Sequence, residues 1–337
     1  MMNNPLSQLQ PLQYKGSSLI LPSDLTYYGE NLQRPECVHC TRDGSVFTSN
    51  WQGGITHILP NGQQRHYLAQ KSPIILRTNG FAITKRKTFL IANLGDDGGV
   101  WELTQQGQLT PFLTHLNNKP LPPCNYVTID QQDRVWVSVS TRHHPREHAY
   151  KKEISDGFIV CTNGITTHKV TDNLGYTNEI QLSPCQNYLY VNETFGRKLS
   201  RFAILNTGKL GQKEIVANFE KGVYPDGLSF DIENKIWVTS IISNRVIRIS
   251  GDGTQQVILE DYNPEHVLKA ERAFNHNGLQ RRHLDFTPSI KLKNISSLAF
   301  GGKNRNIAYL GCLLDNKIAR FTTTTCGIKP YHWNITL

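Results

Sequence analysis

The fold is decided by a pattern that is clearest in the stretch Tyr224-Pro225-Asp226-Gly227-Leu228-Ser229-Phe230, which is followed by Ile236-Trp237-Val238. The polar residue Asp226 precedes apolar residues at two and four positions further on, and a second apolar segment begins about ten residues after it. Alternation with period two is typical of a β-strand, and the turn residues between the two segments indicate an antiparallel hairpin.

The same pattern recurs six times in one phase. The polar residues that open the six units are Glu36, Asn79, Asn125, Asn178, Asp226 and Ser296. They follow one another at roughly 44–53 residues, with about 70 for the last interval, and each unit continues with a second, a third and usually a weaker fourth strand. One such unit cannot bury its faces alone, whereas six arranged in a ring can. The sequence therefore predicts an all-β fold, a six-bladed β-propeller.

The sixth unit lacks a fourth strand of its own after Phe321. We expect Ser18-Leu19-Ile20-Leu21, which precedes the first unit, to supply this strand and close the ring. Residues 1–17 would then be an N-terminal extension, and residues 18–337 would form a single propeller domain.

Two connections are longer than a propeller requires, residues 141–156 and 261–294. The second contains an expected helix that begins at Asn263-Pro264 and ends at Gly278. Both connections should emerge at the end of the axis where the inner strands begin. Because long ordered loops commonly form lids or binding walls, we expect them to line the mouth of the channel. Their basic and histidine residues could hold an anionic group.

The composition excludes several classes of protein. Of the 337 residues, 38% are hydrophobic and 19% are charged, which is typical of a core-forming chain. No apolar run approaches the roughly 18 residues of a membrane span, and the polar start of the chain lacks the apolar core of a signal peptide. The formal net charge is +9, but the basic residues are scattered and do not alternate with aromatic ones. We therefore expect a cytoplasmic protein that binds neither membranes nor nucleic acid, and the sequence makes no prediction of its oligomeric state.

The cysteines favour reduced thiols. There are seven of them, an odd number, and a leader for export is not expected. Cys37 and Cys40 form a C-x-x-C pair, but no second pair follows at a spacing that would complete a zinc site.

The phase of the repeat also predicts a site. Inner strands of a propeller begin at the same end of the central axis, so the six polar residues should converge on one mouth of the channel. Turn propensity alone would explain any one of them. Glu36 and Asp226 together would repel each other in a narrow mouth unless a proton or a cation lies between them. Two carboxylates with amide oxygens suit Ca²⁺, Mg²⁺ or Mn²⁺, and Zn²⁺ could also bind.

Five segments, spread from the first unit to the last, carry a resemblance to a known family. They are Arg34-Pro35-Glu36-Cys37, Asn125-Tyr126-Val127-Thr128-Ile129-Asp130, Thr177-Asn178-Glu179-Ile180-Gln181-Leu182-Ser183-Pro184, Tyr224-Pro225-Asp226-Gly227-Leu228-Ser229-Phe230-Asp231 and Ser297-Leu298-Ala299-Phe300-Gly301-Gly302. Together they resemble the gluconolactonase and senescence-marker-protein family, which includes regucalcin and luciferin-regenerating enzyme.

The resemblance implies a metal-dependent hydrolase that opens a lactone, with one divalent cation in the channel mouth. Its metal ligands would be Glu36, Asn178 and Asp226, with Ca²⁺ favoured over Zn²⁺, Mg²⁺ or Mn²⁺. Asp226 would also take a proton from the attacking water, a role that Glu36 could share, and Asn125 would bind the substrate or stabilise the developing oxyanion. Some members carry an arginine where this chain has Pro123, which leaves the contacts to a sugar acid, and hence the particular substrate, open.

Four further residues are expected on the wall of the substrate pocket, namely Trp51, Arg142, Tyr176 and Glu193. The expected substrate is a small lactone or a molecule like a sugar acid. Two alternatives remain, because a propeller can serve many functions. One is a propeller that binds a metal and a small molecule without turnover, and the other is a different metal-dependent hydrolase, such as a phosphotriesterase.

Overall fold

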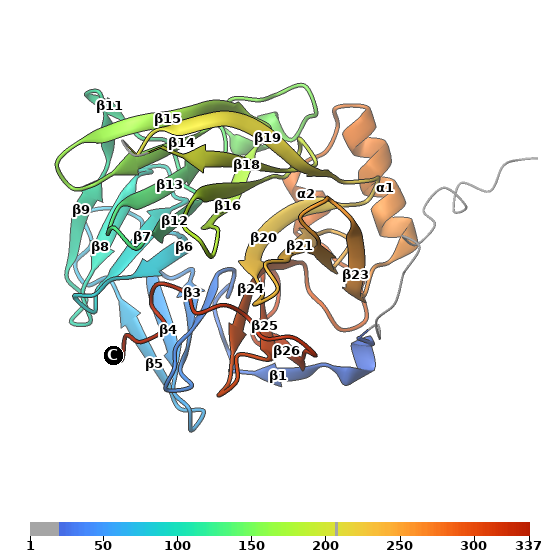
Figure 1. Cartoon of the computed structure of the whole chain (residues 1–337), viewed down its shortest axis with the longest axis horizontal. Helices are drawn as coiled ribbons and strands as arrows, with labels where there is room; N and C mark the ends of the chain where they lie inside the picture. Colours follow the sequence, from blue (N-terminus) through green and yellow to red (C-terminus); the bar gives the residue numbers. More distant parts are fainter. Residues whose placement is uncertain (1–19, 206–207) are drawn as a thin grey trace, which may run out of the picture.

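The computed structural model describes residues 20–205 and 208–337. Six four-stranded antiparallel sheets stand around a central axis, and in five of them the inner strand is the first of the sheet in the chain (Figure 1). The prediction of a six-bladed β-propeller is confirmed.

The blades follow one another along the chain. The first contains β2 (Val38–Cys40), β3 (Val46–Asn50), β4 (Gly54–Ile58) and β5 (Gln64–Leu68), and the second β6 (Thr78–Ile83), β7 (Phe89–Asn93), β8 (Val100–Leu103) and β9 (Leu109–Leu113). The third contains β12 (Tyr126–Ile129), β13 (Val135–Val139), β14 (Gly157–Thr162) and β15 (Thr167–Leu174). The fourth contains β16 (Thr177–Leu182), β17 (Tyr188–Glu193), β18 (Lys198–Ile204) and β19 (Leu210–Asn218), and the fifth β20 (Tyr224–Phe230), β21 (Ile236–Ile241), β22 (Arg245–Ile249) and β23 (Gln255–Glu260). A small hairpin of β10 (His115–Leu116) and β11 (Lys119–Pro120) joins the second and third blades.

The sixth blade joins the two ends of the described chain. It contains β24 (Ile295–Gly301), β25 (Ile307–Cys312), β26 (Ile318–Thr322) and, as its outer strand, β1 (Thr26–Tyr28). An N-terminal strand therefore closes the ring, but the prediction that residues 18–21 supply it is wrong. Ser18 and Leu19 lie outside the described residues, and Ile20 instead forms a parallel bridge with Leu259 of β23. β1 is held in this position by its pairing with β26 and by Tyr28, whose ring packs edge-on against Tyr309 of β25 with centroids 5.8 Å apart.

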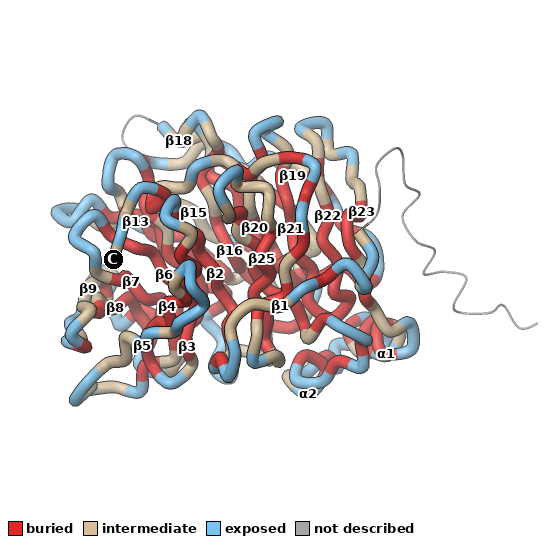
Figure 2. Tube along the Cα trace, turned by 90° about the horizontal axis from the view of Figure 1, so that it is seen from below, coloured by how far each residue is buried: buried red, intermediate tan, exposed pale blue. Residues whose placement is uncertain are grey.

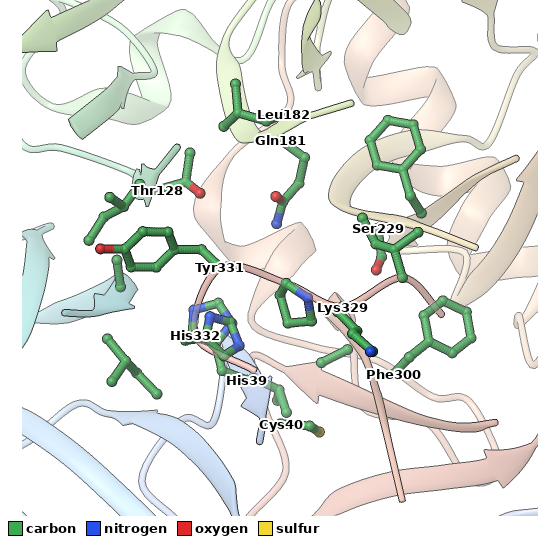
Figure 3. Close-up of a pocket in the computed structure, with 18 of the residues that line it drawn as sticks. His39, Cys40, Thr128, Gln181, Leu182, Ser229, Phe300, Lys329, Tyr331 and His332 are labelled. Carbon is green, nitrogen blue, oxygen red and sulfur yellow. The ribbon is translucent and has the colours of Figure 1, made fainter. Parts of the chain in front are cut away.

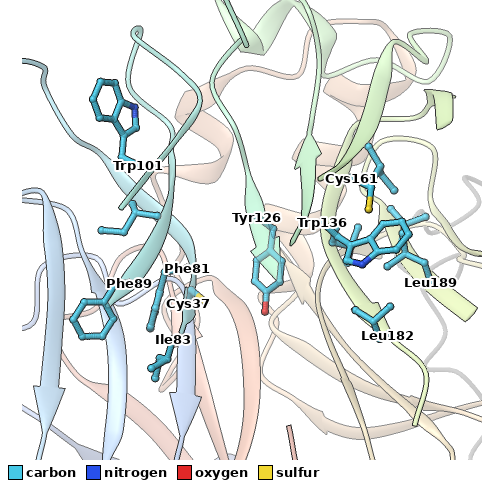
Figure 4. Close-up of a cluster of buried hydrophobic side chains, with 14 of the residues drawn as sticks. Cys37, Phe81, Ile83, Phe89, Trp101, Tyr126, Trp136, Cys161, Leu182 and Leu189 are labelled. Atoms are coloured by element: carbon cyan, nitrogen blue, oxygen red, sulfur yellow. The ribbon is translucent and has the colours of Figure 1, made fainter. Parts of the chain in front are cut away.

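Burial follows the layers of the ring. The inner and middle strands are almost wholly buried, and the exposed residues gather on the outer strands and loops (Figure 2). One core cluster extends across the first four blades, with Phe81, Phe89, Tyr126 and Trp136 among its large side chains (Figure 4). Packing between neighbouring blades thus stabilises each sheet, as the repeat requires.

Two blades contain the same buried arrangement of a tryptophan, an aspartate and an arginine. The indole Nε1 atoms of Trp136 and Trp237 each donate a hydrogen bond of 2.9 Å to an aspartate six residues earlier in the chain, Asp130 and Asp231 respectively. An arginine pairs with each aspartate. The buried carboxylates are therefore fully partnered, which distinguishes them from those at the mouth of the channel.

The inner strands are irregular where the polar residues stand. The strand register shifts between Thr78 and Phe81, between Thr177 and Ile180 and between Pro225 and Leu228. Bulges of this kind re-aim side chains. Gly227 follows Asp226 because the neighbouring inner strand passes closely there: a Cβ atom at Gly227 would lie 2.5 Å from the carbonyl oxygen of Ser296.

The two long connections contain the described helices. A short 3₁₀ segment, η3 (Arg146–Ala149), lies in the first, and α1 (Pro264–Asn275) and α2 (Arg281–Leu284) lie in the second; another 3₁₀ turn, η2 (Pro22–Asp24), precedes β1. Helix α1 begins as expected, with Asn263 as its N-cap, whose side chain accepts a hydrogen bond from the His266 amide. It ends three residues before Gly278, because Asn277 adopts a φ of 55° and takes the left-handed position that terminates a helix. None of the helices in residues 20–205 and 208–337 has the length and hydrophobicity of a membrane span.

Helix α1 is firmly docked on the ring. Val267, Ala270 and Phe274 pack into an apolar cluster with residues of the fourth and fifth blades. On the same side, the Glu271 carboxylate accepts hydrogen bonds from Arg197, from the Gly222 amide at 2.9 Å and from the Tyr224 hydroxyl at 2.7 Å.

Candidate active site

A small cavity lies at the end of the axis where the inner strands begin. Glu36, Asn125, Asn178 and Asp226 all line it, so four of the six polar residues chosen by their phase in the repeat come together. All four side chains are buried. The cavity volume is about 30 Å³, which is room for very few water molecules.

The other two polar residues of the repeat do not line this cavity. Asn79 donates a hydrogen bond of 2.9 Å from its side chain to the carbonyl oxygen of Asn125. Ser296 donates one of the same length from its hydroxyl to the carbonyl oxygen of Glu36. They fix the backbone that carries two of the cavity residues.

Asp226 is an unusual carboxylate. It is 4% exposed, and no described residue donates a hydrogen bond to its side-chain oxygens. Burial raises the pKa of Asp226 well above its usual value, and the nearby Glu36 and Glu179 carboxylates raise it further, against the opposing charges of Arg34 and Arg146. A buried carboxylate without a donor is costly unless a ligand compensates it.

Glu36 is partly compensated by the protein. Its Oε2 atom accepts a hydrogen bond of 2.7 Å from Nε of Arg34. The Arg34 guanidinium in turn lies 4.3 Å from the centroid of the Trp51 ring. Arg34 has a φ of 50°, in the left-handed region that few arginines adopt.

Asn178 presents an oxygen to the cavity region. Its amide nitrogen donates to the Thr194 hydroxyl at 3.0 Å, and that hydroxyl donates to the Pro225 carbonyl at 2.7 Å. Because this network assigns the nitrogen, the Oδ1 atom remains as the acceptor of Asn178.

The donor set fits a hard divalent cation. Two carboxylates and an amide oxygen are ligands that Ca²⁺ and Mg²⁺ prefer. In residues 20–205 and 208–337, no three His, Cys, Asp or Glu side chains form a group that could hold a metal. A cation at this mouth would therefore depend on Asn178 as its third protein ligand, beside Glu36 and Asp226.

Sequence reasoning missed Glu179, a buried carboxylate that does not line the cavity but lies close enough to act on Asp226. It is 5% exposed and accepts a hydrogen bond of 2.9 Å from the Leu228 amide. Burial raises the pKa of Glu179 to about 8, and the charge of Glu36 adds to this shift. Strict alternation places it on the face opposite Asn178, and only the bulge between Thr177 and Ile180 would have signalled a different direction.

The four residues expected on the pocket wall divide into two groups. Tyr176 lines the cavity, whereas Trp51, Arg142 and Glu193 are not among its described lining residues. The Trp51 ring instead packs against the Arg34 guanidinium.

The other two residues outside the cavity have partners elsewhere. Arg142 forms a two-pronged contact with Asp172, at 2.9 and 3.0 Å. Glu193 accepts a hydrogen bond of 2.7 Å from the Gly175 amide and pairs with Lys213. Both side chains are therefore already satisfied by structural contacts.

The two long connections contribute residues that the sequence did not single out. Arg146 and Tyr150 come from the first, and Arg281 and Leu284 come from the second. Nothing in the repeat could identify them, because the connections lie outside its phase. Tyr150, Tyr176 and Phe195 pack against one another with ring centroids 4.6–5.3 Å apart, and so form an aromatic wall.

A larger cavity of about 90 Å³ lies at the opposite end of the axis. The far ends of the six inner strands and residues 328–332 of the C-terminal segment line it, and His332 lies beside His39 (Figure 3). None of its described lining residues is an aspartate or a glutamate. Of these two cavities, only the smaller one is therefore lined by carboxylate side chains.

Two curated proteins are similar to part of the chain. Strictosidine synthase-like protein 13 of Arabidopsis thaliana is 27% identical over 208 residues, which are 58% of this chain and 48% of that protein. An uncharacterized protein of Sulfolobus acidocaldarius is 26% identical over 123 residues, 36% of this chain and 42% of that protein. The chain thus spans about half the length of the curated relatives that it matches.

Solved structures share the fold. Regucalcin from Agrobacterium tumefaciens, described as a calcium-binding protein, is 16% identical with a TM-score of 0.66, over 95% of this chain and 100% of that one. A gluconolactonase from Xanthomonas campestris is 15% identical with a TM-score of 0.66, over 88% and 89% of the two chains.

The family match covers most of the ring. Residues 35–260, which run from Pro35 beside Glu36 to the end of β23, match the SMP-30/gluconolactonase/LRE-like region. This span includes Asn125, Asn178 and Asp226. The chain belongs to the SMP-30/gluconolactonase/LRE-like family.

Proposed function

We propose that this protein is a metal-dependent hydrolase that opens a lactone at the channel mouth, with the reacting ester group directed toward the small cavity. The observation that carries the proposal is the buried Asp226 carboxylate, to which no described residue donates, in one cavity with Glu36 and Asn178. Membership of the family supports a lactonase-type hydrolase. The description of the regucalcin structure as calcium-binding favours Ca²⁺ as the cation.

Glu36, Asn178 and Asp226 would hold the cation. When bound, a divalent cation supplies Lewis-acid polarisation of the ester carbonyl and makes a water molecule more acidic. Arg34 fixes one oxygen of Glu36, so the direction of that carboxylate is set before any ligand arrives.

The remaining steps fall to groups of the chain. Asp226 would accept a proton from the attacking water molecule while the oxygen of that water molecule bonds to the carbonyl carbon. The ester bond of the ring then breaks, and the proton passes to the leaving alkoxide, which gives a hydroxy acid. Asn125 would donate a hydrogen bond to the oxygen that gains negative charge. The aromatic wall of Tyr150, Tyr176 and Phe195 would limit access of bulk water.

The test is hydrolysis of a panel of lactones, with and without EDTA, by the wild-type protein and by Asp226→Asn and Glu36→Gln. We expect turnover that EDTA abolishes and that a divalent cation restores, and a loss of at least about a hundredfold in kcat/KM for each variant. Glu233→Gln is the matched control, because this carboxylate lies at the surface, 53% exposed.

Three results would contradict the proposal. Turnover that survives both EDTA and Asp226→Asn would exclude the assigned residues. Hydrolysis of phosphotriesters but of no lactone would indicate the different hydrolase, and binding of a lactone without turnover would indicate a non-enzymatic propeller.

A further inference from the structure

The candidate active site carries more positive than negative side chains. Its lining includes three guanidinium groups, those of Arg34, Arg146 and Arg281, against the carboxylates of Glu36 and Asp226. Arg34 is paired with Glu36. Arg281 is paired at its Nε with Asp285, at 2.8 Å, and that partner is 47% exposed. The positive charge of the third arginine, Arg146, is not balanced by an ion pair of this kind in the part of the chain that the structure describes.

Arg146 forms no ion pair with any described residue. Its Nη2 atom donates a hydrogen bond of 3.0 Å to the Ser140 hydroxyl, and its guanidinium lies 5.6 Å from the ring centroid of Tyr176. Its Nε atom is buried and has no hydrogen-bond partner in the described chain. A buried charged donor without an acceptor is costly, so it indicates a ligand that supplies the acceptor.

The two connections that carry Arg146 and Arg281 are fastened to each other. The Arg281 amide donates a hydrogen bond of 3.1 Å to Oε2 of Glu147. Tyr150 and Leu284, one from each connection, line the same cavity as these two arginines. The two guanidinium groups are therefore held over the same cavity, and are not independent charges on mobile surface loops.

We propose that the substrate is a lactone that carries an ionised acid group, and that Arg146 and Arg281 bind this group. The inference rests on the proposed function, since it names the substrate class of the same site. Arginine suits the task because its donors match the oxygens of a carboxylate or a phosphate. Arg146 lies close enough to Asp226 to oppose its negative charge, but no described carboxylate forms an ion pair with the Arg146 guanidinium.

The kinetic test compares three lactones of similar size: gluconolactone, which is neutral, glucaric acid monolactone, which has a carboxylate, and gluconolactone phosphate. We expect the wild-type protein to prefer one of the two acidic lactones, and the choice between them identifies the acid group. Arg146→Gln and Arg281→Gln should each lower this preference, measured as a ratio of kcat/KM values, by roughly ten- to hundredfold.

Matched controls come from the same connections. Lys152→Gln and Arg282→Gln each remove one exposed positive charge that does not line the cavity, and they should leave the ratio unchanged. A wild-type preference for the neutral lactone would overturn the proposal. So would an equal loss for all three lactones in Arg146→Gln, or a loss of the preference in the controls.

A binding test separates this proposal from the proposed function. Glucarate and gluconolactone phosphate should raise the Tm of the wild-type protein, glucitol should not, and Arg146→Gln should abolish the shift. If no lactone is hydrolysed but an acid still binds through Arg146, the proposed function fails and the acid-binding site stands. If Tm does not respond to either acid, or responds equally in Arg146→Gln, the acid-binding site fails.

Discussion

At the scale of single residues, Asp226 combines two properties that rarely occur together: it is deeply buried, and none of the described residues donates a hydrogen bond to its carboxylate. Asp130 and Asp231 are equally buried, but each is bonded to an indole nitrogen and to an arginine. Within the described residues, Asp226 therefore lacks the partners that compensate the other two carboxylates.

This contrast gives a prediction about stability. In EDTA, Asp226→Asn should raise the free energy of unfolding by about 1–2 kcal/mol, because a neutral amide avoids the cost of burying an aspartate, whether that cost is an unpaired charge or the uptake of a proton. Urea unfolding followed by tryptophan fluorescence measures the change. Added Ca²⁺ should stabilise the wild-type protein and leave Asp226→Asn unaffected.

Asp231→Asn is the informative control, because its charge is fully partnered. It should destabilise the protein. If Asp226→Asn also proved less stable than the wild type in EDTA, the carboxylate would have a stabilising partner in the metal-free protein, and the prediction would be wrong.

At the scale of elements, the C-terminal segment closes the end of the channel opposite the candidate active site. Gly327 forms a bridge with Asp231, and the Ile328 amide donates to the Phe230 carbonyl at 3.1 Å. Further along, His332 lies 4.4 Å from His39, ring to ring, and both are buried (Figure 3). His39 is itself hydrogen-bonded to the Phe81 carbonyl, at 2.6 Å.

The two imidazoles should make stability depend on pH. Burial lowers the pKa of His39 to about 4 and, together with the charge of His39, lowers the pKa of His332 well below its usual value. The unfolded chain then binds protons near pH 6.5 while the folded chain does not. Stability should therefore be complete above pH 6.5 and fall as the pH drops below it, by about 2 kcal/mol for each imidazole between pH 7 and pH 5.

His332→Phe isolates one of these contributions. It keeps an aromatic ring beside His39 but cannot be protonated, so the loss of unfolding free energy between pH 7 and pH 5 should be smaller than in the wild type. His168→Phe, at an exposed position on β15, is the control and should keep the full slope. Equal slopes for His332→Phe and the wild type would show that His332 is protonated to the same extent in both states.

At the scale of the whole molecule, ring closure depends on β1, the outer strand that pairs with β26. A chain that begins at Gly29 lacks β1 and exposes the edge of β26. Its Tm should fall by roughly 5 °C or more relative to the full chain. A chain that begins at Ser18 keeps β1. Its Tm should equal that of the full chain, as expected if residues 1–17 are an extension. Calorimetry would contradict this picture if both truncations melted alike.

Much of this architecture could be predicted from the sequence. Asp226 and its counterparts, such as Asn178, stand in the same phase in every blade, and a phase repeated six times constrains the ring more than any single strand could. The sequence does not distinguish residues 18–21 from Thr26–Tyr28 as the closing strand, because both are short strand-like stretches. The contacts that hold Thr26–Tyr28 at β26, such as those of Tyr28 with Tyr309 and with the Leu59 carbonyl, become visible only in the folded ring.

The candidate site could be predicted only in part. Glu36, Asn125, Asn178 and Asp226 meet because the repeat brings them to one mouth, which the phase requires. Arg146 and Arg281 could not be identified, because their positions depend on how two connections of irregular structure pack against each other and on the ring. A sequence pattern contains no information about such packing.

The central claim is that Glu36, Asn178 and Asp226 hold one divalent cation. The most direct measurement is the metal content of the full chain purified without added cations and then equilibrated with a limiting mixture of Ca²⁺, Mg²⁺, Mn²⁺ and Zn²⁺, analysed by mass spectrometry of the elements. Our account expects about one divalent cation per chain in the wild type and in Glu233→Gln, with Ca²⁺ favoured, and none in Asp226→Asn. A wild-type protein that retains no cation, or an Asp226→Asn variant that retains as much as the wild type, would contradict it.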